Sequence, residues 1–368
     1  MKIRKLDQRE HGKTRKLWEN VFPEDTKAFL DYYYFFKTRD NEIYVAEEDE
    51  GVRSMLHLNP YLIQVEEEQF LLHYIIAVAT EPKYRGRGYM RALLVYAMQE
   101  MYRRGEPFTY LVPAAEAIYT PYDFRFIYDQ TGYELSENLP QEAADFLQCG
   151  AFAGTGGIES RDASTGDAGR IADFFNIHLA EKKQVFAVRD EQYYQAVLFE
   201  RQSENGGIRL LEKEGTLVGT FAYCNEDGLE IQEPVFAEGY DGLFIREAGR
   251  KPTVMARILR PEKLMRAMKV KPGESVDCSF AVLDSILPQN SRIWRIQGGG
   301  EGEDGRLHVR ETEDSEGVLT IAALTSLLFG YRTVEETAKE ADVLLSAHLQ
   351  TELQKIRPLR NVYLNEFV

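Results

Sequence analysis

The densest group of potential ligand-binding residues is the segment 85–88, Arg-Gly-Arg-Gly, which separates an apolar run ending at Thr80 from an amphipathic run beginning near Tyr89. The first turn of a helix leaves several backbone N–H groups unpaired, and together with the helix dipole these groups attract anions. Glycine lets the backbone approach a ligand closely, and the two arginines add positive charge. The segment therefore predicts an anion site, and a diphosphate is the ligand that suits it.

The same segment also has less specific interpretations. A glycine-rich turn between a strand and a helix occurs in ordinary packing and in dinucleotide sites. Neither the GxGxxG fingerprint nor the GxxxxGK[ST] phosphate loop is present at this turn. The turn alone leaves phosphate binding and plain packing both open, so the interpretation depends on the elements around it.

The flanking residues predict a meander of strands followed by one helix. Strands are expected at 42–46, 52–58, 61–65 and 70–79, with polar turns between them, after a first strand at 1–6 and helices at 8–20 and 25–37. The run LLHYIIAVA is typical of a central strand buried on both faces. His57 and His73 both lie on expected strands, so they are interpreted as core or wall residues. A helix that ends at Gly105 is predicted by one apolar face, and a strand at 108–112 follows it. The residues of this apolar face are Met90, Leu93, Leu94, Ala97, Met98 and Met101.

The rest of the chain predicts two further domains. Residues 149–169 are rich in Gly, Ser and Ala, which indicates a linker or exposed loop. Helices at 167–182 and 190–201 and a hairpin at 209–224 follow, without a glycine-rich loop. From Pro252, a strand, a helix at 261–269, strands near 275–283 and 291–296, a flexible hairpin tip at 298–305 and an apolar helix follow. We expect an α+β protein with domains at 1–150, 151–251 and 252–368.

Composition excludes several classes of function. The formal net charge of −16 argues against nucleic-acid binding and mildly favours a cationic partner, although acidity also serves solubility. The sequence has neither a secretory signal nor a run of about 18 apolar residues, so we expect a cytoplasmic protein without a membrane segment. Cys149, Cys224 and Cys278 are far apart and form no CxxC pair, so no metal site is expected.

Residues 78–90, VATEPKYRGRGYM, resemble the coenzyme A signature of the GCN5-related N-acetyltransferases. Arg85 and Gly88 match its first two fixed positions, and Met90 departs from the third, where a small residue is usual. The whole chain more closely resembles the enhanced-intracellular-survival acetyltransferases and their relatives in Gram-positive bacteria. That resemblance implies an acetyltransferase fold first, then a degenerate acetyltransferase-like domain without the coenzyme A loop, and finally a sterol-carrier-protein-like domain. It also implies a homo-oligomer, since relatives in this family resemble hexamers.

The resemblance further implies acetyl-CoA as co-substrate and a role for each matching residue. The pantetheine arm would contact the strand end and the pyrophosphate would contact the turn and helix start; these residues are Val78, Ala79, Thr80, Arg85, Gly86, Arg87, Gly88, Tyr89, Met90 and Arg91. Tyr119 would be the general acid, with Tyr122 as its rival because the Asp123-Phe124 pair lacks an expected glycine. The C-terminal carboxylate of Val368 would be the general base, unless residues 362–368 are only a packed edge strand.

Acetyl transfer to an amine requires a proton acceptor, an oxyanion donor and a proton for the leaving thiolate. A carboxylate, a backbone N–H at the strand end and a tyrosine would supply these three functions. We therefore expect an N-acetyltransferase that acts on a cationic amine, such as an aminoglycoside, a polyamine or a lysine side chain. The alternative is a non-catalytic protein that binds coenzyme A or a lipid.

Overall fold

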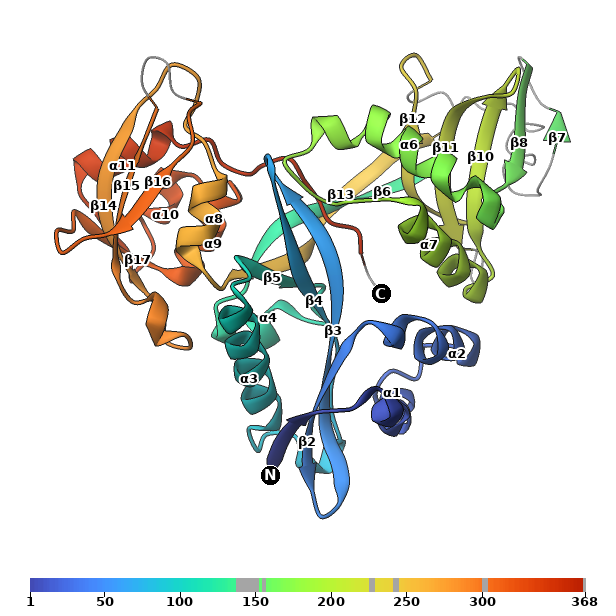
Figure 1. Ribbon diagram of the computed structural model, residues 1–368, viewed down its shortest axis with the longest axis horizontal. Helices are drawn as coiled ribbons and strands as arrows, with labels where there is room; N and C mark the ends of the chain where they lie inside the picture. Colours follow the sequence, from blue (N-terminus) through green and yellow to red (C-terminus); the bar gives the residue numbers. More distant parts are fainter. Residues whose placement is uncertain (137–151, 154–156, 225–228, 241–244, 300–303, 367–368) are drawn as a thin grey trace.

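The computed structural model describes residues 1–136, 152–153, 157–224, 229–240, 245–299 and 304–366. Three lobes are visible in Figure 1: the N-terminal lobe in blue and teal, the middle of the chain in green and yellow, and a C-terminal lobe in orange and red. Helices and strands are mixed in all three lobes. The predicted α+β class is confirmed.

The first lobe is a sheet with helices on both faces. Its elements are β1 (Lys2–Lys5), α1 (Arg15–Val21), α2 (Lys27–Phe35), β2 (Glu42–Glu48), β3 (Gly51–Val65), β4 (Glu68–Thr80), α3 (Tyr89–Arg104), β5 (Phe108–Leu111), α4 (Glu116–Tyr119) and β6 (Arg125–Leu135). Along β2, Ile43 and Val45 pack in the cluster with α1 and α2, whereas Tyr44 and Ala46 pack with α3. This alternation follows from the period of two along a strand. The helix predicted after residue 88 is confirmed, and it ends at Gly105 with φ 83°.

Strand β3 corrects the prediction of two separate strands at 52–58 and 61–65. It runs unbroken through Pro60, which lies opposite His73 of β4. Proline normally ends a strand because it lacks an N–H. Here the pairing of β3 with β2 ends at Leu58, so Pro60 lies where the far edge of β3 has no β2 partner. The missing N–H therefore breaks no β2–β3 pairing.

The second lobe extends the same sheet. Its elements are β7 (Phe152–Ala153), β8 (Ile158–Asp162), α6 (Ala168–His178), β9 (Val185–Ala187), α7 (Glu191–Ser203), β10 (Gly207–Lys213), β11 (Thr216–Cys224) and β12 (Glu230–Phe236). The prediction of a linker over 149–169 is wrong for β8, which pairs antiparallel with β10. Strand β8 buries only Ile158 and Ser160, a pattern too weak to stand out in a stretch rich in small residues.

Strand β13 (Ile245–Ile258) joins the first two lobes. It lies between β5 and β6 and pairs antiparallel with both, so that Ala256 is opposite Tyr110 on one side and Arg125 on the other. Strands β6 and β12 share a single described pair, Ile231 with Tyr133. Through β13 and β6, the described strands of both lobes form one continuous sheet.

The C-terminal lobe has its own sheet, in the order β16-β15-β14-β17-β18. Its elements are α8 (Pro261–Ala267), β14 (Val276–Leu283), β15 (Ile293–Gly298), β16 (His308–Glu311), β17 (Gly317–Thr320), α9 (Ile321–Leu328), α10 (Val334–Thr337), β18 (Leu344–Leu345) and α11 (Ala347–Lys355). Every residue of α9 is buried, because the helix packs against this sheet and also against β13 and β6. Residues 300–303 of the predicted hairpin tip lie outside the described residues. In the described part of the chain, no helix has the length and apolar character needed to cross a membrane.

The end of the chain leaves the C-terminal lobe and returns to the other two. Strand β19 (Val362–Tyr363) pairs parallel with β9, and β9 pairs antiparallel with β3. Figure 1 shows the chain running from the C-terminal lobe back toward β3 and the second lobe. The chain end thus lies at the junction of the first and second lobes.

Candidate active site

A bulge in β4 separates this strand from its neighbour β5. In the register with β3, Met55 is opposite Ala79 and His57 is opposite Ile76. Two residues of β4, Ala77 and Val78, therefore lie opposite the single β3 residue Leu56. Ala77 has φ 52°, a left-handed conformation that is unfavourable for a residue with a side chain. Strands β4 and β5 pair only at Tyr74 and Tyr110. Beyond that pair, no strand of the described chain pairs with this edge of β4, and its backbone groups up to Thr80 can bind a ligand.

The turn after β4 leads directly into a helix start without a cap. Gly86 and Gly88 have φ 72° and 84°, and a Cβ at either position would meet no atom within 4 Å. Glycine is therefore required by backbone conformation and not by lack of space. No side chain caps α3, and its first intrahelical bond runs from the N–H of Ala92 to Gly88. The N–H groups of Tyr89, Met90 and Arg91 precede that bond and have no partner within the helix, an arrangement that favours an anion.

Cationic side chains surround this helix start. Arg85 donates to the carbonyl of Thr80 at 3.2 Å, and the guanidinium of Arg87 lies 5.3 Å from the ring centre of Tyr84. Arg85, Arg87 and Arg91 are exposed, and within the described chain none of them forms an ion pair with a carboxylate. In a chain with net charge −16, such a group of unpaired cations creates a local positive potential.

Tyr89 and Met90 face the protein interior. The Tyr89 hydroxyl donates to Glu48 at 2.5 Å, and this bond raises the pKa of Tyr89 to about 12. Met90 packs against the main core beside α3. Both residues therefore offer a ligand their backbone N–H groups, and their side chains anchor the helix start.

Tyr119, the predicted acid, is at the end of α4 on the loop from β5 to β6. Its side chain is 7 % exposed and packs edge-on against Phe124 at 5.9 Å between ring centres. Burial raises the pKa of Tyr119 to about 12, so the phenol is protonated at neutral pH. The rival Tyr122 is only half-buried, and its carbonyl accepts a hydrogen bond from Arg257.

A cavity lies at the junction of the first two lobes. Among its lining residues are Lys37, Tyr61, Tyr193, Glu200, Glu233 and Glu366. Burial is the main reason why the pKa of Tyr74 is raised, and the charges of Tyr119 and Glu366 add to it. Tyr74 is thus within electrostatic range both of the predicted acid and of the chain end.

Glu366 fixes the chain end in this cavity. It is 4 % exposed, and its Oε1 accepts from Tyr193 at 2.9 Å and from Arg189 at 3.2 Å. Arg189 also makes a two-point ion pair with Glu233, at 2.6 and 2.7 Å. The other oxygen of Glu366, Oε2, is buried without a hydrogen-bond partner in the described chain. Val368, whose carboxylate is predicted as the base, lies outside the described residues.

Most residues of this cavity could not be predicted from the sequence. Glu366 belongs to the chain end that is predicted to be packed, and Arg189, Tyr193 and Glu200 belong to the lobe for which the sequence predicts no coenzyme A loop. Their contacts span up to 177 residues of sequence, so local spacing carries no signal for them. Among the described residues, no three His, Cys, Asp or Glu side chains are grouped as metal ligands.

Comparison with known proteins agrees with this architecture. Residues 2–127 match the acetyltransferase (GNAT) domain family, and residues 261–365 match the sterol carrier protein domain family. No curated protein matches the chain. A probable N-acyltransferase from Enterococcus faecalis is similar over 100 % of this chain and 99 % of its own, with 19 % identity and a TM-score of 0.80.

Two other solved structures are similar over the full length of both chains. A GCN5-related N-acetyltransferase from Anabaena variabilis has 15 % identity and a TM-score of 0.78, and Eis1 from Mycobacterium abscessus has 14 % and 0.71. At these identities the likeness concerns the fold. The predicted acetyltransferase and sterol-carrier-like parts are confirmed. The chain therefore carries an acetyltransferase domain of the GNAT family at residues 2–127 and a sterol carrier protein domain at residues 261–365.

Proposed function

We propose that this protein is an acetyl-CoA-dependent N-acetyltransferase whose acceptor is a cationic amine, such as a polyamine, an aminoglycoside or a lysine side chain. One observation carries the proposal: the unpaired edge of β4 leads directly into the positively charged start of α3. A long ligand with amide groups at one end and a diphosphate at the other suits this pair of features. Acetyl-CoA has both.

The donor site would use the backbone more than side chains. The amides of the pantetheine arm would pair with the edge of β4 at Val78, Ala79 and Thr80. The diphosphate would accept from the N–H groups of residues 86–91, with Arg85, Arg87 and Arg91 adding charge. This division agrees with the inward positions of the Tyr89 and Met90 side chains.

The reaction would proceed through a tetrahedral intermediate. The neutral amine attacks the thioester carbonyl, so a C–N bond forms and the C–S bond then breaks. A backbone N–H at the β4 bulge would stabilise the oxyanion. The amine proton passes to the carboxylate of Val368, and the leaving thiolate takes a proton from Tyr119. The raised pKa of Tyr119, about 12, keeps this proton available at neutral pH.

The junction cavity, about 40 Å³ in volume, would hold one amine group of the acceptor, whose remainder would lie outside it. The Oε2 atom of Glu366 has no hydrogen-bond partner among the described residues and would accept a hydrogen bond from an ammonium group. Tyr61 and Tyr193 line the same cavity, where their rings lie near the cations of Lys37 at 4.4 Å and Arg189 at 4.9 Å. Glu200 is a further carboxylate of the lining, and it forms an ion pair with Arg201. These features support an acceptor that carries more than one amine.

A second candidate function follows from a cavity in the C-terminal lobe. Its lining combines apolar residues of α9 and α11, including Leu327, Leu328 and Leu353, with Lys271, Arg332 and Arg360. Such a lining suits an amphiphile with an anionic head. In this alternative, the protein would bind coenzyme A or a lipid without catalysis.

Thiol release measured with acetyl-CoA and a panel of polyamines, aminoglycosides and lysine peptides separates the two functions. The matched negative acceptor is the fully N-acetylated form of each amine. We expect release that depends on a free amine. Binding of acetyl-CoA by calorimetry, without thiol release for any amine, would favour the non-catalytic alternative.

We also propose that the enzyme works in the cytoplasm as a homo-oligomer, for which the family resemblance suggests a hexamer. Light scattering coupled to gel filtration at several protein concentrations measures the assembly directly. A monomer at all concentrations would contradict this proposal.

A further inference from the structure

The loop that carries Tyr119 contains a strained residue. After α4, a 3₁₀ turn (Thr120–Tyr122) leads to Asp123, which has φ 66°. A left-handed conformation costs a residue with a side chain about 1 kcal/mol or more, so neighbouring contacts must hold it. The N–H of Phe124 donates to the carbonyl of Tyr119 at 3.4 Å, so this strained turn also sets the position of the tyrosine.

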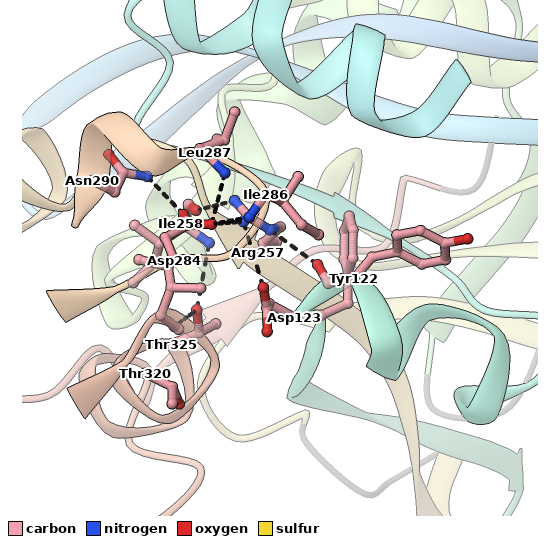
Figure 2. Close-up of polar contacts among 12 residues, drawn as sticks. Tyr122, Asp123, Arg257, Ile258, Asp284, Ile286, Leu287, Asn290, Thr320 and Thr325 are labelled. Atoms are coloured by element: carbon pink, nitrogen blue, oxygen red, sulfur yellow. Dashed lines mark hydrogen bonds and ion pairs between the residues drawn. The ribbon is translucent and has the colours of Figure 1, made fainter. Parts of the chain in front are cut away.

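Arg257 of β13 contacts both Tyr122 and Asp123 of this turn. Its side chain is 0 % exposed; Nε donates to the carbonyl of Tyr122 at 3.0 Å, and Nη2 lies 3.6 Å from the Asp123 carboxylate. Its Nη1 donates to the carbonyl of Ile258 at 2.9 Å. Figure 2 shows the guanidinium between the Tyr122–Asp123 turn and Asp284.

Asp284 fixes the guanidinium from the C-terminal lobe. Its Oδ1 accepts from Arg257 at 2.6 Å and from the N–H groups of Ile286 and Leu287 at 3.0 and 2.8 Å. Its Oδ2 accepts from Asn290, which also donates to the carbonyl of Leu259. Both side-chain oxygens of this buried carboxylate are therefore satisfied, and the network has little freedom to move (Figure 2).

We propose that Arg257 is a positioning residue for acetyl transfer: it links the sterol-carrier-like lobe to the loop that presents Tyr119 to the leaving thiolate. This inference rests on the proposed function, and it gives the C-terminal lobe a role in catalysis that requires no ligand of its own. A buried ion pair contributes little net stability compared with apolar residues. The directed bond to the Tyr122 carbonyl is a contact that an apolar residue could not replace.

The experiment compares four variants of the full chain with wild type, using the panel amine that gives the fastest thiol release. They are Arg257→Met, Arg257→Met/Asp284→Asn, Tyr119→Phe and Arg257→Met/Tyr119→Phe. The second variant removes both charges of the pair while an amide oxygen remains for Ile286 and Leu287. Arg295→Met is the matched control, because Arg295 pairs with Asp277 at the surface of the same lobe.

We expect Arg257→Met to lower kcat about 100-fold with the KM for acetyl-CoA changed less than about twofold, since a small displacement of a catalytic group has an effect of this size. The double variant Arg257→Met/Asp284→Asn, called the neutralised variant, should regain much of the Tm that Arg257→Met loses. It should not regain the lost kcat. Adding Tyr119→Phe to Arg257→Met should lower kcat by much less than the product of the two single effects, because both act through the same hydroxyl. Arg295→Met should behave as wild type.

Three results would overturn the inference. Recovery of kcat together with Tm in the neutralised variant would make Arg257 a stability residue only. If Arg257→Met/Tyr119→Phe lowered kcat by the full product of the two single effects, Arg257 would not act through Tyr119. Wild-type kcat in the single variant Arg257→Met would show that the contact is dispensable. If wild type itself releases no thiol with any amine, the proposed function fails; in an active wild type, the three results above concern Arg257 alone.

Discussion

The guanidinium of Arg189 donates to the Oε1 atom of Glu366 at 3.2 Å and so connects the second lobe to the end of the chain. The same guanidinium makes a two-point ion pair with Glu233 of β12. Its charge is fully buried and lies over the ring of Phe175 at 4.4 Å. Three segments far apart in sequence are therefore joined by one side chain, and two of its partners, Glu233 and Glu366, line the junction cavity.

Replacing Arg189 by Met should destabilise the protein and release the chain end. The substitution leaves Glu233 and Glu366 without their cation, and breaking a buried pair costs about 3–5 kcal/mol. Thermal unfolding should show a clearly lower Tm, and thiol release should fall with it. Arg103→Met, at an exposed arginine on α3, is the matched control. An unchanged Tm would mean that the chain end is held by other contacts.

Replacing Tyr119 by Phe should lower kcat about 100-fold while the KM for acetyl-CoA stays the same, because a general acid contributes to the chemical step and not to donor binding. Tyr122→Phe is the comparison, and it should cost little. The pKa of Tyr119, about 12, predicts that wild-type kcat does not fall through loss of this proton below about pH 11. Steady-state kinetics across that range tests both points. A larger loss for Tyr122→Phe would transfer the acid role to that residue.

Replacing Gly88 by Ala should weaken donor binding. The left-handed conformation at φ 84° costs an alanine about 1–2 kcal/mol, and relaxation would turn the first N–H groups of α3 away from the diphosphate. Losing one charge-assisted hydrogen bond predicts a KM for acetyl-CoA about tenfold higher. Gly215→Ala is the control, since Gly215 has φ 78°, equally open surroundings and a place in the hairpin of the second lobe. If Gly88→Ala and Gly215→Ala had the same KM for acetyl-CoA, the turn at Gly88 would have no role in donor binding.

Extending the chain by two glycines after Val368 should lower kcat about 100-fold, because each added residue can move the carboxylate by roughly 3.5 Å. Inserting the same two glycines at Gly215 controls for general effects of an insertion. Donor binding, measured by calorimetry, should be unaffected in both proteins. Full turnover in the extended protein would exclude the chain-terminal carboxylate as the base.

His57 should make stability depend on pH in the acid range. Full burial lowers the pKa of His57 to about 3, whereas the unfolded chain binds this proton near pH 6.5. The unfolded state therefore gains a proton first, and the free energy of unfolding decreases as the pH falls from 6.5 toward 3, by as much as about 5 kcal/mol. Urea unfolding of His57→Gln should show a shallower pH dependence, with His308→Gln as the exposed control. The same slope in both variants would assign the effect to other groups.

Local features of the donor site could be predicted from the sequence. The glycines at 86 and 88 and the apolar face of α3 follow from short-range rules of turn and helix formation, and the structure places them as expected. The bulge at Ala77 could not be predicted, because alanine gives no signal for a left-handed conformation. Pro60 predicts a break in the strand that the structure does not have, because the effect of a proline here depends on where β2 ends.

Features that depend on distant partners could not be predicted. Strand β13 was expected only from 254 onward, as the entrance to a third domain, yet it runs from Ile245 to Ile258 between β5 and β6. The ion pair of Arg257 with Asp284 and the contact of Arg189 with Glu366 likewise join residues that no local pattern relates. Side-chain chemistry at these positions becomes interpretable only when the strand order is known.

The position of β13 also has a consequence for biosynthesis. The central sheet of the first lobe cannot close until residue 258 has left the ribosome, although that lobe's own strands end at Leu135. A nascent chain, or an excised fragment of residues 1–136, would expose the facing edges of β5 and β6, and unpaired edges promote aggregation. We therefore expect the acetyltransferase lobe to mature late and only as part of the longer polypeptide.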